Sequence, residues 1–167
     1  LMRDIEQALD YYRKSLEINL AEGIEAEASI NYGNIGVAYL ELGMMDSAMH
    51  YISKRHSLVN QMNDRKGMAT SLESLGDYYL RAGDYDRALG YYRQALAQSR
   101  VLGILETTKS TLKSMSDLYE AKGDYMTSLS YYKSFVNLRD SILNQETVRR
   151  IEQIELEYAY DKETQEH

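Results

Sequence analysis

The sequence repeats itself with a period of forty residues. Gly43, Gly83 and Gly123 are forty residues apart. Four further sets keep the same spacing: Ala8, Ala48, Ala88 and Ser128; Tyr11, Tyr51, Tyr91 and Tyr131; Tyr39, Tyr79 and Tyr119; Gly36, Gly76 and Ser116. Five sets in one register reflect a structural unit, not composition. A fixed period of about 20 to 50 residues indicates stacked supersecondary units, none of which can bury its apolar face alone.

Each unit carries the pattern of two helices. In the unit from residue 64 to 103, apolar residues recur at steps of three and four, and Gly83 divides them. Gly83 is suited to end the first helix, and Asp84 can cap the second. We therefore predict an all-α, right-handed array of seven repeat helices followed by a terminal helix. The expected turns are Gly23, Gly43, Asn63, Gly83, Gly103 and Gly123. Leu143 departs from this series, and Asn144 is expected to take over its turn.

Composition excludes several classes of protein. The chain has no Pro, which favours near-continuous helix, and no Cys, so disulfides and thiol chemistry are excluded. No apolar run approaches the roughly 18 residues of a membrane span. A net charge of −7 disfavours binding to nucleic acid. No direct membrane contact is expected for these residues.

No constellation of catalytic or metal-binding residues is apparent. A phosphate-binding glycine loop is missing, and His50 and His56 are six residues apart, whereas two metal ligands on one helix face need a spacing of four. We interpret both imidazoles as surface or partly packed side chains. The sequence therefore predicts neither enzymatic activity, nor a metal site, nor a cofactor.

Small residues mark the expected closest approach within each helix pair. Gly76 and Ala88 hold these positions in one unit, and Ser116 and Ser128 hold them in the next. Side-chain volume at a crossing sets the distance between helix axes. We therefore expect the last pair to be spaced slightly wider.

The repeated positions resemble the tetratricopeptide repeat, whose signature combines W-x2-L-G-x2-Y with A-x3-F. The matching residues are Tyr32, Ile35, Gly36, Tyr39, Ala48 and Ile52; Leu72, Leu75, Gly76, Tyr79, Ala88 and Tyr92; Leu112, Met115, Ser116, Tyr119, Ser128 and Tyr132. The signature Trp and Pro are absent, Arg55 replaces a small or apolar residue, and the period is 40 instead of about 34. The resemblance implies a superhelical solenoid of antiparallel helix pairs.

The same resemblance implies a groove lined by the first helix of each pair. It places these residues there: Asn34, Val37, Glu41, Glu73, Ser74, Asp77, Arg81, Lys113, Ser114, Asp117 and Glu120. Asn34, Ser74 and Ser114 share one register and are expected to hydrogen-bond a ligand backbone. Acids outnumber bases in this set, so we expect a negative field and a ligand that carries Lys or Arg. Charge reversal of Asp77 and Asp117 is expected to lower affinity without unfolding the array.

The units divide the chain into a repeat array over 1–143 and a charged helix over 144–167. The array comprises a half repeat (1–23) and full repeats at about 24–63, 64–103 and 104–143. Residue 1 aligns with Glu41, inside a unit, so we expect a piece of a longer protein. The stretches 138–146 and 150–158 are similar to the end of the repeat region in bacterial sensor proteins, which implies a terminal helix that caps the array or also transmits a signal.

The combined interpretation is a non-catalytic module that binds a protein or peptide segment, in the sensory or regulatory region of a larger bacterial signalling protein. A free-standing scaffold and a receptor for a small diffusible peptide remain open. The sensor resemblance implies a region outside the cytoplasmic membrane. Two copies are expected to pair through Asp4–Ala21 or the C-terminal helix, because part of the surface around Leu9, Tyr12 and Leu16 should be exposed or covered by another copy.

Overall fold

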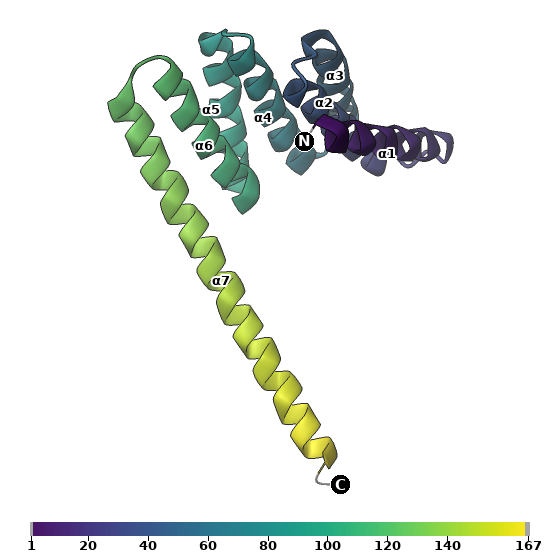
Figure 1. Ribbon diagram of the computed structural model, residues 1–167, viewed down its shortest axis with the longest axis vertical. Coiled ribbons are helices and arrows are strands. Elements are labelled where there is room, and N and C mark those ends of the chain that lie inside the picture. The colour runs from purple at the N-terminus through teal and green to yellow at the C-terminus, as the bar shows by residue number, and fades with distance from the viewer. Residues whose placement is uncertain (1, 166–167) are drawn as a thin grey trace.

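The computed structural model describes residues 2–165, with side chains described for residues 4–157, and over this range it contains helices and no strand. The helices are α1 (Met2–Ala21), α2 (Glu25–Glu41), α3 (Met45–Gln61), α4 (Arg65–Arg81), α5 (Tyr85–Leu102), α6 (Leu105–Ala121) and α7 (Tyr125–Gln165). Each helix packs against the next in the chain, and α4 also contacts α2 and α6 (Figure 1). These contacts confirm the predicted all-α solenoid.

The structure has a turn at each of the positions predicted at Gly23, Gly43, Asn63, Gly83, Gly103 and Gly123, which confirms the forty-residue register. Gly23, Gly43, Gly83, Gly103 and Gly123 have φ values between 66° and 77°, and Asn63 has a φ of 52°. A residue in this left-handed conformation lets the chain satisfy carbonyls at the helix end. At the end of α4, for example, the Asp84 amide donates to the Tyr79 carbonyl oxygen at 2.9 Å.

The turn expected at Leu143 and Asn144 does not exist. Helix α7 continues through both residues as part of a 41-residue helix, so the last repeat helix and the expected terminal helix are one element. Left-handed backbone costs a branched residue such as Leu about 1–2 kcal/mol. No Gly or Pro follows Gly123 to interrupt the helix.

Helix pairs approach closely at the small residues. A Cβ on Gly36 would lie 2.7 Å from Ile52 Cγ1, and a Cβ on Gly76 would overlap the Tyr92 ring. In the last unit Ser116 Oγ lies 3.1 Å from Ser128 Oγ, so a polar contact replaces the apolar one. The wider spacing of that pair stays a prediction.

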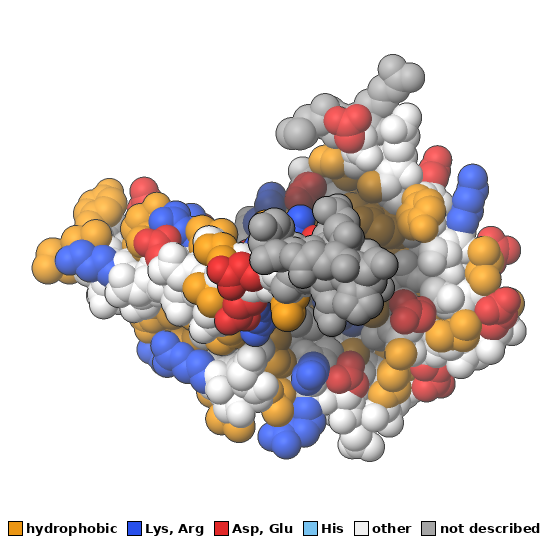
Figure 2. Space-filling view, turned by 90° about the horizontal axis from the view of Figure 1, so that it is seen from below, with side chains coloured by type: hydrophobic (Ala, Val, Ile, Leu, Met, Phe, Trp, Pro, Cys, Tyr) orange, Lys and Arg blue, Asp and Glu red, His pale blue; other side chains and the backbone are white. Residues whose placement is uncertain are grey.

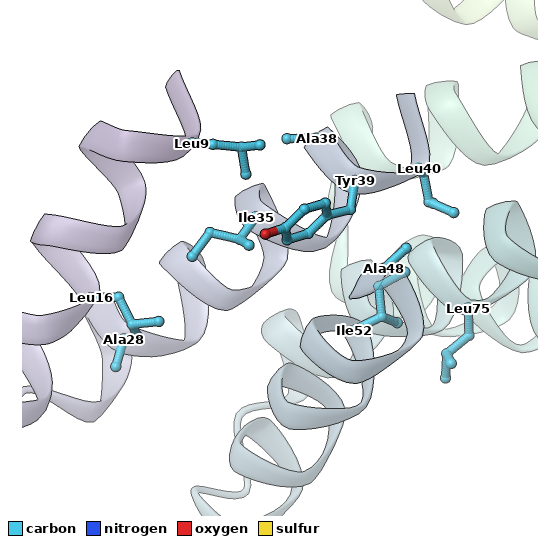
Figure 3. Close-up of a cluster of buried hydrophobic side chains, with 10 residues drawn as sticks. All are labelled: Leu9, Leu16, Ala28, Ile35, Ala38, Tyr39, Leu40, Ala48, Ile52 and Leu75. Atoms are coloured by element: carbon cyan, nitrogen blue, oxygen red, sulfur yellow. The ribbon is translucent and has the colours of Figure 1, made fainter. Parts of the chain in front are cut away.

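The tyrosine sets form the second contact within each pair. Tyr79 stacks on Tyr91 with ring centroids 5.5 Å apart, and the same separation joins Tyr119 to Tyr131. The core continues through the stack of helices. Figure 3 shows buried side chains of α1, α2 and α3 converging with Leu75 of α4 in one cluster.

Helix α7 leaves the repeats after its first turns. Phe135 and Leu138 pack against the core around α5 and α6. Ile142 is still half-buried, and after it the helix projects from the array (Figure 1). The described side chains from Leu143 onward are all exposed. None of the helices in the described range is both long and apolar enough to cross a membrane.

Candidate functional site

All of the predicted groove residues except Glu120 fall into two groups. The first lies around a hollow of about 650 Å³ at the N-terminal end of the array. We call it the N-terminal hollow; its lining residues are Asp4, Ile5, Ala8, Tyr12, Asn34, Val37, Ala38, Glu41 and Arg81. The second group lies between α4 and α6, where side chains bond to one another.

The N-terminal hollow has an apolar floor and a charged rim. Residues of α1 at positions 5, 8 and 12 share one helix face and meet Val37 and Ala38 of α2. Val37 keeps 39% of its surface exposed, although it is apolar. The polar lining residues Asn34, Glu41 and Arg81 are exposed. This arrangement suits a ligand that inserts an apolar side chain and presents polar groups around it.

Sequence reasoning found the α2 and α4 side of this hollow and missed the α1 side. Asp4, Ile5, Ala8 and Tyr12 were not among the predicted groove residues. A signal was available, because Ala48 and Ala88 belong to the same forty-residue set as Ala8 and are fully buried by a preceding helix. Ala8 is only half-buried and lines the hollow.

The apolar face expected on α1 is smaller than the sequence indicated. Leu9 and Leu16 are 5% and 8% exposed, because α2 covers them, so they do not belong to an open face. Tyr12 is half-buried and lines the hollow. The large exposed apolar side chains of α1 are instead Tyr11, Ile18 and Leu20.

The second group and its neighbours are here called the polar cluster: Arg55, Glu73, Ser74, Asp77, Tyr92, Lys113, Ser114 and Asp117. Asp77 accepts hydrogen bonds from Tyr92 Oη at 2.6 Å and from Ser114 Oγ at 3.1 Å, which links α4, α5 and α6. Ser74 Oγ donates to the Thr70 carbonyl oxygen at 3.2 Å. Two of the three residues expected to meet a ligand backbone therefore donate within the chain, and Asn34 is the one with an exposed side chain.

Burial changes the charge of this cluster. It raises the pKa of the Glu73 carboxyl to about 7, with nearby Asp77 adding to the effect and Arg55 opposing it. Burial also raises the pKa of Asp77, although the hydrogen bonds from Tyr92 and Ser114 oppose that shift. Lys113 Nζ lies 2.5 Å from Asp117 Oδ1, so these charges offset each other.

The negative field is therefore weaker than a count of acids predicts. Two acids, Asp4 and Glu41, face one base, Arg81, around the hollow. Charged side chains of both signs are mixed with hydrophobic ones over the face shown in Figure 2. Glu120 is exposed at the end of α6 and does not line the hollow.

Arg55 explains one departure from the repeat pattern. Its side chain packs where a Cβ on Gly33 would lie, and its guanidinium donates to Thr70 Oγ1 at 2.5 Å. The pKa of Arg55 is lowered by burial, while the charges of Asp64 and Glu73 oppose that shift. Gly33 therefore makes room for this large side chain, and the carboxyl groups of Asp64 and Glu73 lie near its charge.

His56 is a structural residue and His50 is an exposed one. His56 Nδ1 lies 2.9 Å from Ser71 Oγ, and burial lowers the pKa of this imidazole. His50 is exposed and packs edge-on against Tyr51. Within the described residues, no group of three His, Cys, Asp or Glu side chains could hold a metal ion.

Comparison with known proteins agrees with this architecture. A family model described as tetratricopeptide repeat matches residues 27–100 and 67–141. No curated protein matches the chain. The solved structure of BtubC from P. vanneervenii is similar, with a TM-score of 0.67 and 19% identity over 83% of this chain and 58% of that one.

Two further structures extend the comparison. A Rap protein complexed with competence and sporulation factor has a TM-score of 0.74 and 15% identity, over 82% of this chain and 38% of its own. The TPR domain of Arabidopsis FLU has a TM-score of 0.62 and 18% identity, over 70% of this chain and 98% of its own. The chain thus spans 58% of BtubC and 38% of the Rap protein, and identities this low establish the fold alone.

Proposed function

Because the chain belongs to the tetratricopeptide repeat family, we propose that it is a non-catalytic module that binds a peptide or protein segment in the N-terminal hollow. The observation that carries this proposal is the exposed apolar floor. Val37, Tyr12 and Ile5 border an open volume of about 650 Å³, and part of each side chain remains accessible there. Apolar surface left open in a concave site contributes affinity when a ligand covers it.

The ligand that fits this hollow has two chemical parts. An apolar side chain would cover the floor, and a Lys or Arg would approach Glu41 on the rim. Asn34 can both donate to and accept from a peptide backbone, because its side-chain amide has both functions. Arg81 adds to this preference, because its positive charge repels a second basic group of the ligand on its side of the hollow.

A charge reversal tests the location of the site. Peptides with one apolar and one basic residue, drawn from a random library, would be titrated by fluorescence anisotropy against wild type and Glu41→Lys. We expect Glu41→Lys to weaken binding several-fold, mainly through slower association at low salt, because rim charges act on encounter.

Glu120→Lys is the matched control, because Glu120 is an equally acidic predicted groove residue that lies outside the hollow. It should leave affinity unchanged. Stronger loss in Glu120→Lys than in Glu41→Lys, or a preference for acidic peptides, would contradict the proposal.

The wider role we propose is the sensory or regulatory region of a larger bacterial signalling protein. The similarity of residues 138–158 to the end of the repeat region in bacterial sensors supports this role, as does the fold shared with the Rap proteins. Ligand in the hollow would shift α1 against α2, and successive helix contacts would carry the change to α7.

Hydrogen exchange distinguishes this role from its alternatives. A transmitting array should show changed amide exchange in α7 beyond Leu143 when ligand binds. Changes confined to α1 and α2 would instead favour a free-standing scaffold. Tight binding of a free peptide of a few residues would favour a receptor for a small diffusible peptide.

A further inference from the structure

The free part of α7 exposes an apolar stripe. Leu143, Val148, Ile151 and Ile154 keep 52%, 53%, 51% and 50% of their surfaces exposed. All four lie on the segment that projects from the repeats in Figure 1. A helix with no tertiary contacts is marginal in water, because most helical stability in proteins comes from packing an apolar face.

This stripe is not a continuation of the surface that packs on α6. A helix turns by about 100° per residue, so Ile151 and Ile154 lie within about 60° of each other. By the same count, Leu138 and Phe135 lie on the opposite side, roughly 140–160° from Ile151. Packing against the repeats therefore leaves the stripe open to a second partner.

The stripe has the spacing of a two-stranded coiled coil. Asn144 and Ile151 are seven residues apart, as are Thr147 and Ile154, and the two series alternate at steps of three and four. In heptad terms Asn144 and Ile151 hold position a, and Thr147 and Ile154 hold position d. Ile151 at a and Ile154 at d would by themselves favour three or four strands, whereas an Asn at a, here Asn144, specifies a dimer in one register. The choice of two strands therefore rests on Asn144.

We propose that two copies of this chain pair in parallel and in register through Asn144, Thr147, Ile151 and Ile154 of α7. This proposal is independent of what the N-terminal hollow binds. The second copy covers the apolar stripe on each helix, and the paired Asn144 side chains hydrogen-bond each other inside the seam.

Charge along the edges of the stripe supports this partner and this orientation. In a parallel pair, position g of one helix faces position e of the next heptad in the other, five residues further on. Arg150 then faces Glu155 of the second copy, and Leu143 faces Val148 of the second copy. An antiparallel pair would place position e against position e, which brings Val148 and Glu155 to the same side.

The absence of cysteine from the chain makes the test direct. Thr147→Cys and Ile154→Cys, each in the full chain, should form disulfide-linked homodimers on mild oxidation. A mixture of the two variants should give few mixed dimers, because these positions are one heptad apart in a parallel pair. Gln153→Cys, on the opposite side of the same helix, is the matched control and should link several-fold more slowly. Predominantly mixed dimers would overturn the parallel register.

A pair of charge insertions tests the stripe in the cysteine-free chain. Analytical ultracentrifugation should show a concentration-dependent dimer for wild type and a dissociation constant raised about tenfold or more for Ile151→Asp, because the charge would be buried in the seam. Leu156→Asp should associate like wild type, since Leu156 is 72% exposed but lies outside the stripe. Equal effects of both variants, or a wild type that stays monomeric at the highest concentration, would overturn the proposal. Thermal melting of both variants checks that the repeats remain folded.

Discussion

Helices α2 and α4 place equivalent side chains in opposite surroundings. Asn34 and Val37 of α2 are exposed around the N-terminal hollow. Forty residues later, Ser74 is buried and Asp77 is bonded to Tyr92 and Ser114. The difference comes from the neighbouring helices, since α5 and α6 supply hydroxyl donors to α4 whereas α1 leaves a gap beside α2. A repeat position therefore does not by itself define a ligand-facing side chain.

The largest expected effect is steric, in the closed region. Gly76→Leu should destabilise the array by about 3 kcal/mol or more, because even a Cβ at this position overlaps the Tyr92 ring. Gly90→Ala is a matched control on the adjoining helix α5, since a Cβ there meets nothing within 4 Å. It should stabilise the protein by about 0.5–1 kcal/mol, as Ala is the better helix former. Thermal melting of both variants measures the difference, and equal melting temperatures would contradict it.

Glu73 gives the closed region a pH dependence. Its folded-state pKa of about 7 is above the ordinary value of 4.5, so the folded protein keeps a proton that the unfolded chain releases. Its contribution to stability is therefore complete below pH 4.5 and is lost as pH rises through 7.

Glu73→Gln should remove this dependence, because the amide is neutral at every pH. The variant should match wild type near pH 4 and exceed its stability at pH 8 by up to about 3 kcal/mol, at 1.36 kcal/mol per pKa unit. Urea unfolding at both pH values measures the difference. A variant that is less stable than wild type at pH 8 would show that the carboxylate, and not its burial, dominates.

Removing the Tyr92 hydroxyl tests the hydrogen bond from Tyr92 to Asp77 in the polar cluster. Tyr92→Phe should cost about 1–3 kcal/mol, because Asp77 loses the donor at 2.6 Å and remains largely buried. Tyr12→Phe is the matched change at the equivalent position beside the open hollow, and it should change stability by less than about 0.5 kcal/mol. Denaturant unfolding of both variants measures this; similar losses would mean that the two regions do not differ in this way.

The sequence predicted the repeat fold well, because the periodic glycines end helices and the periodic tyrosines stack between paired helices. Six turns follow from residues that tolerate positive φ. The prediction failed at Leu143, where a turn was expected and the helix continues. The one indication of a continuous helix was that a Leu holds the position where the other repeats have Gly or Asn. A local sequence pattern also does not indicate whether a side chain has a hydrogen-bond partner on another helix.

The pair Asp77 and Tyr92 shows why the site was harder to predict. Asp117 and Tyr132 are the same residue types forty residues later, yet Asp117 pairs with Lys113 of its own helix. Asp77 was expected to be an exposed groove acid whose reversal to Lys would leave the array folded. Its hydrogen bonds from Tyr92 and Ser114 argue against that expectation, since Asp77→Lys would leave two donors without their acceptor. The effect of the reversal on stability stays a prediction.

The smallest expected effect comes from giving α2 the residue of α4. Val37→Asp should change the free energy of unfolding by less than about 0.5 kcal/mol, because Val37 is 39% exposed and the new carboxylate can remain hydrated. The tyrosine donor of the α4 contact has no counterpart here, since Ile52 holds the position of Tyr92. Urea unfolding of Val37→Asp therefore measures how open the hollow is. A loss above about 2 kcal/mol in the free energy of unfolding would mean that Val37 is covered in solution by α1 or by another chain. The surroundings of α2 and α4 would then differ in which residues cover these side chains, and not in whether the side chains are exposed.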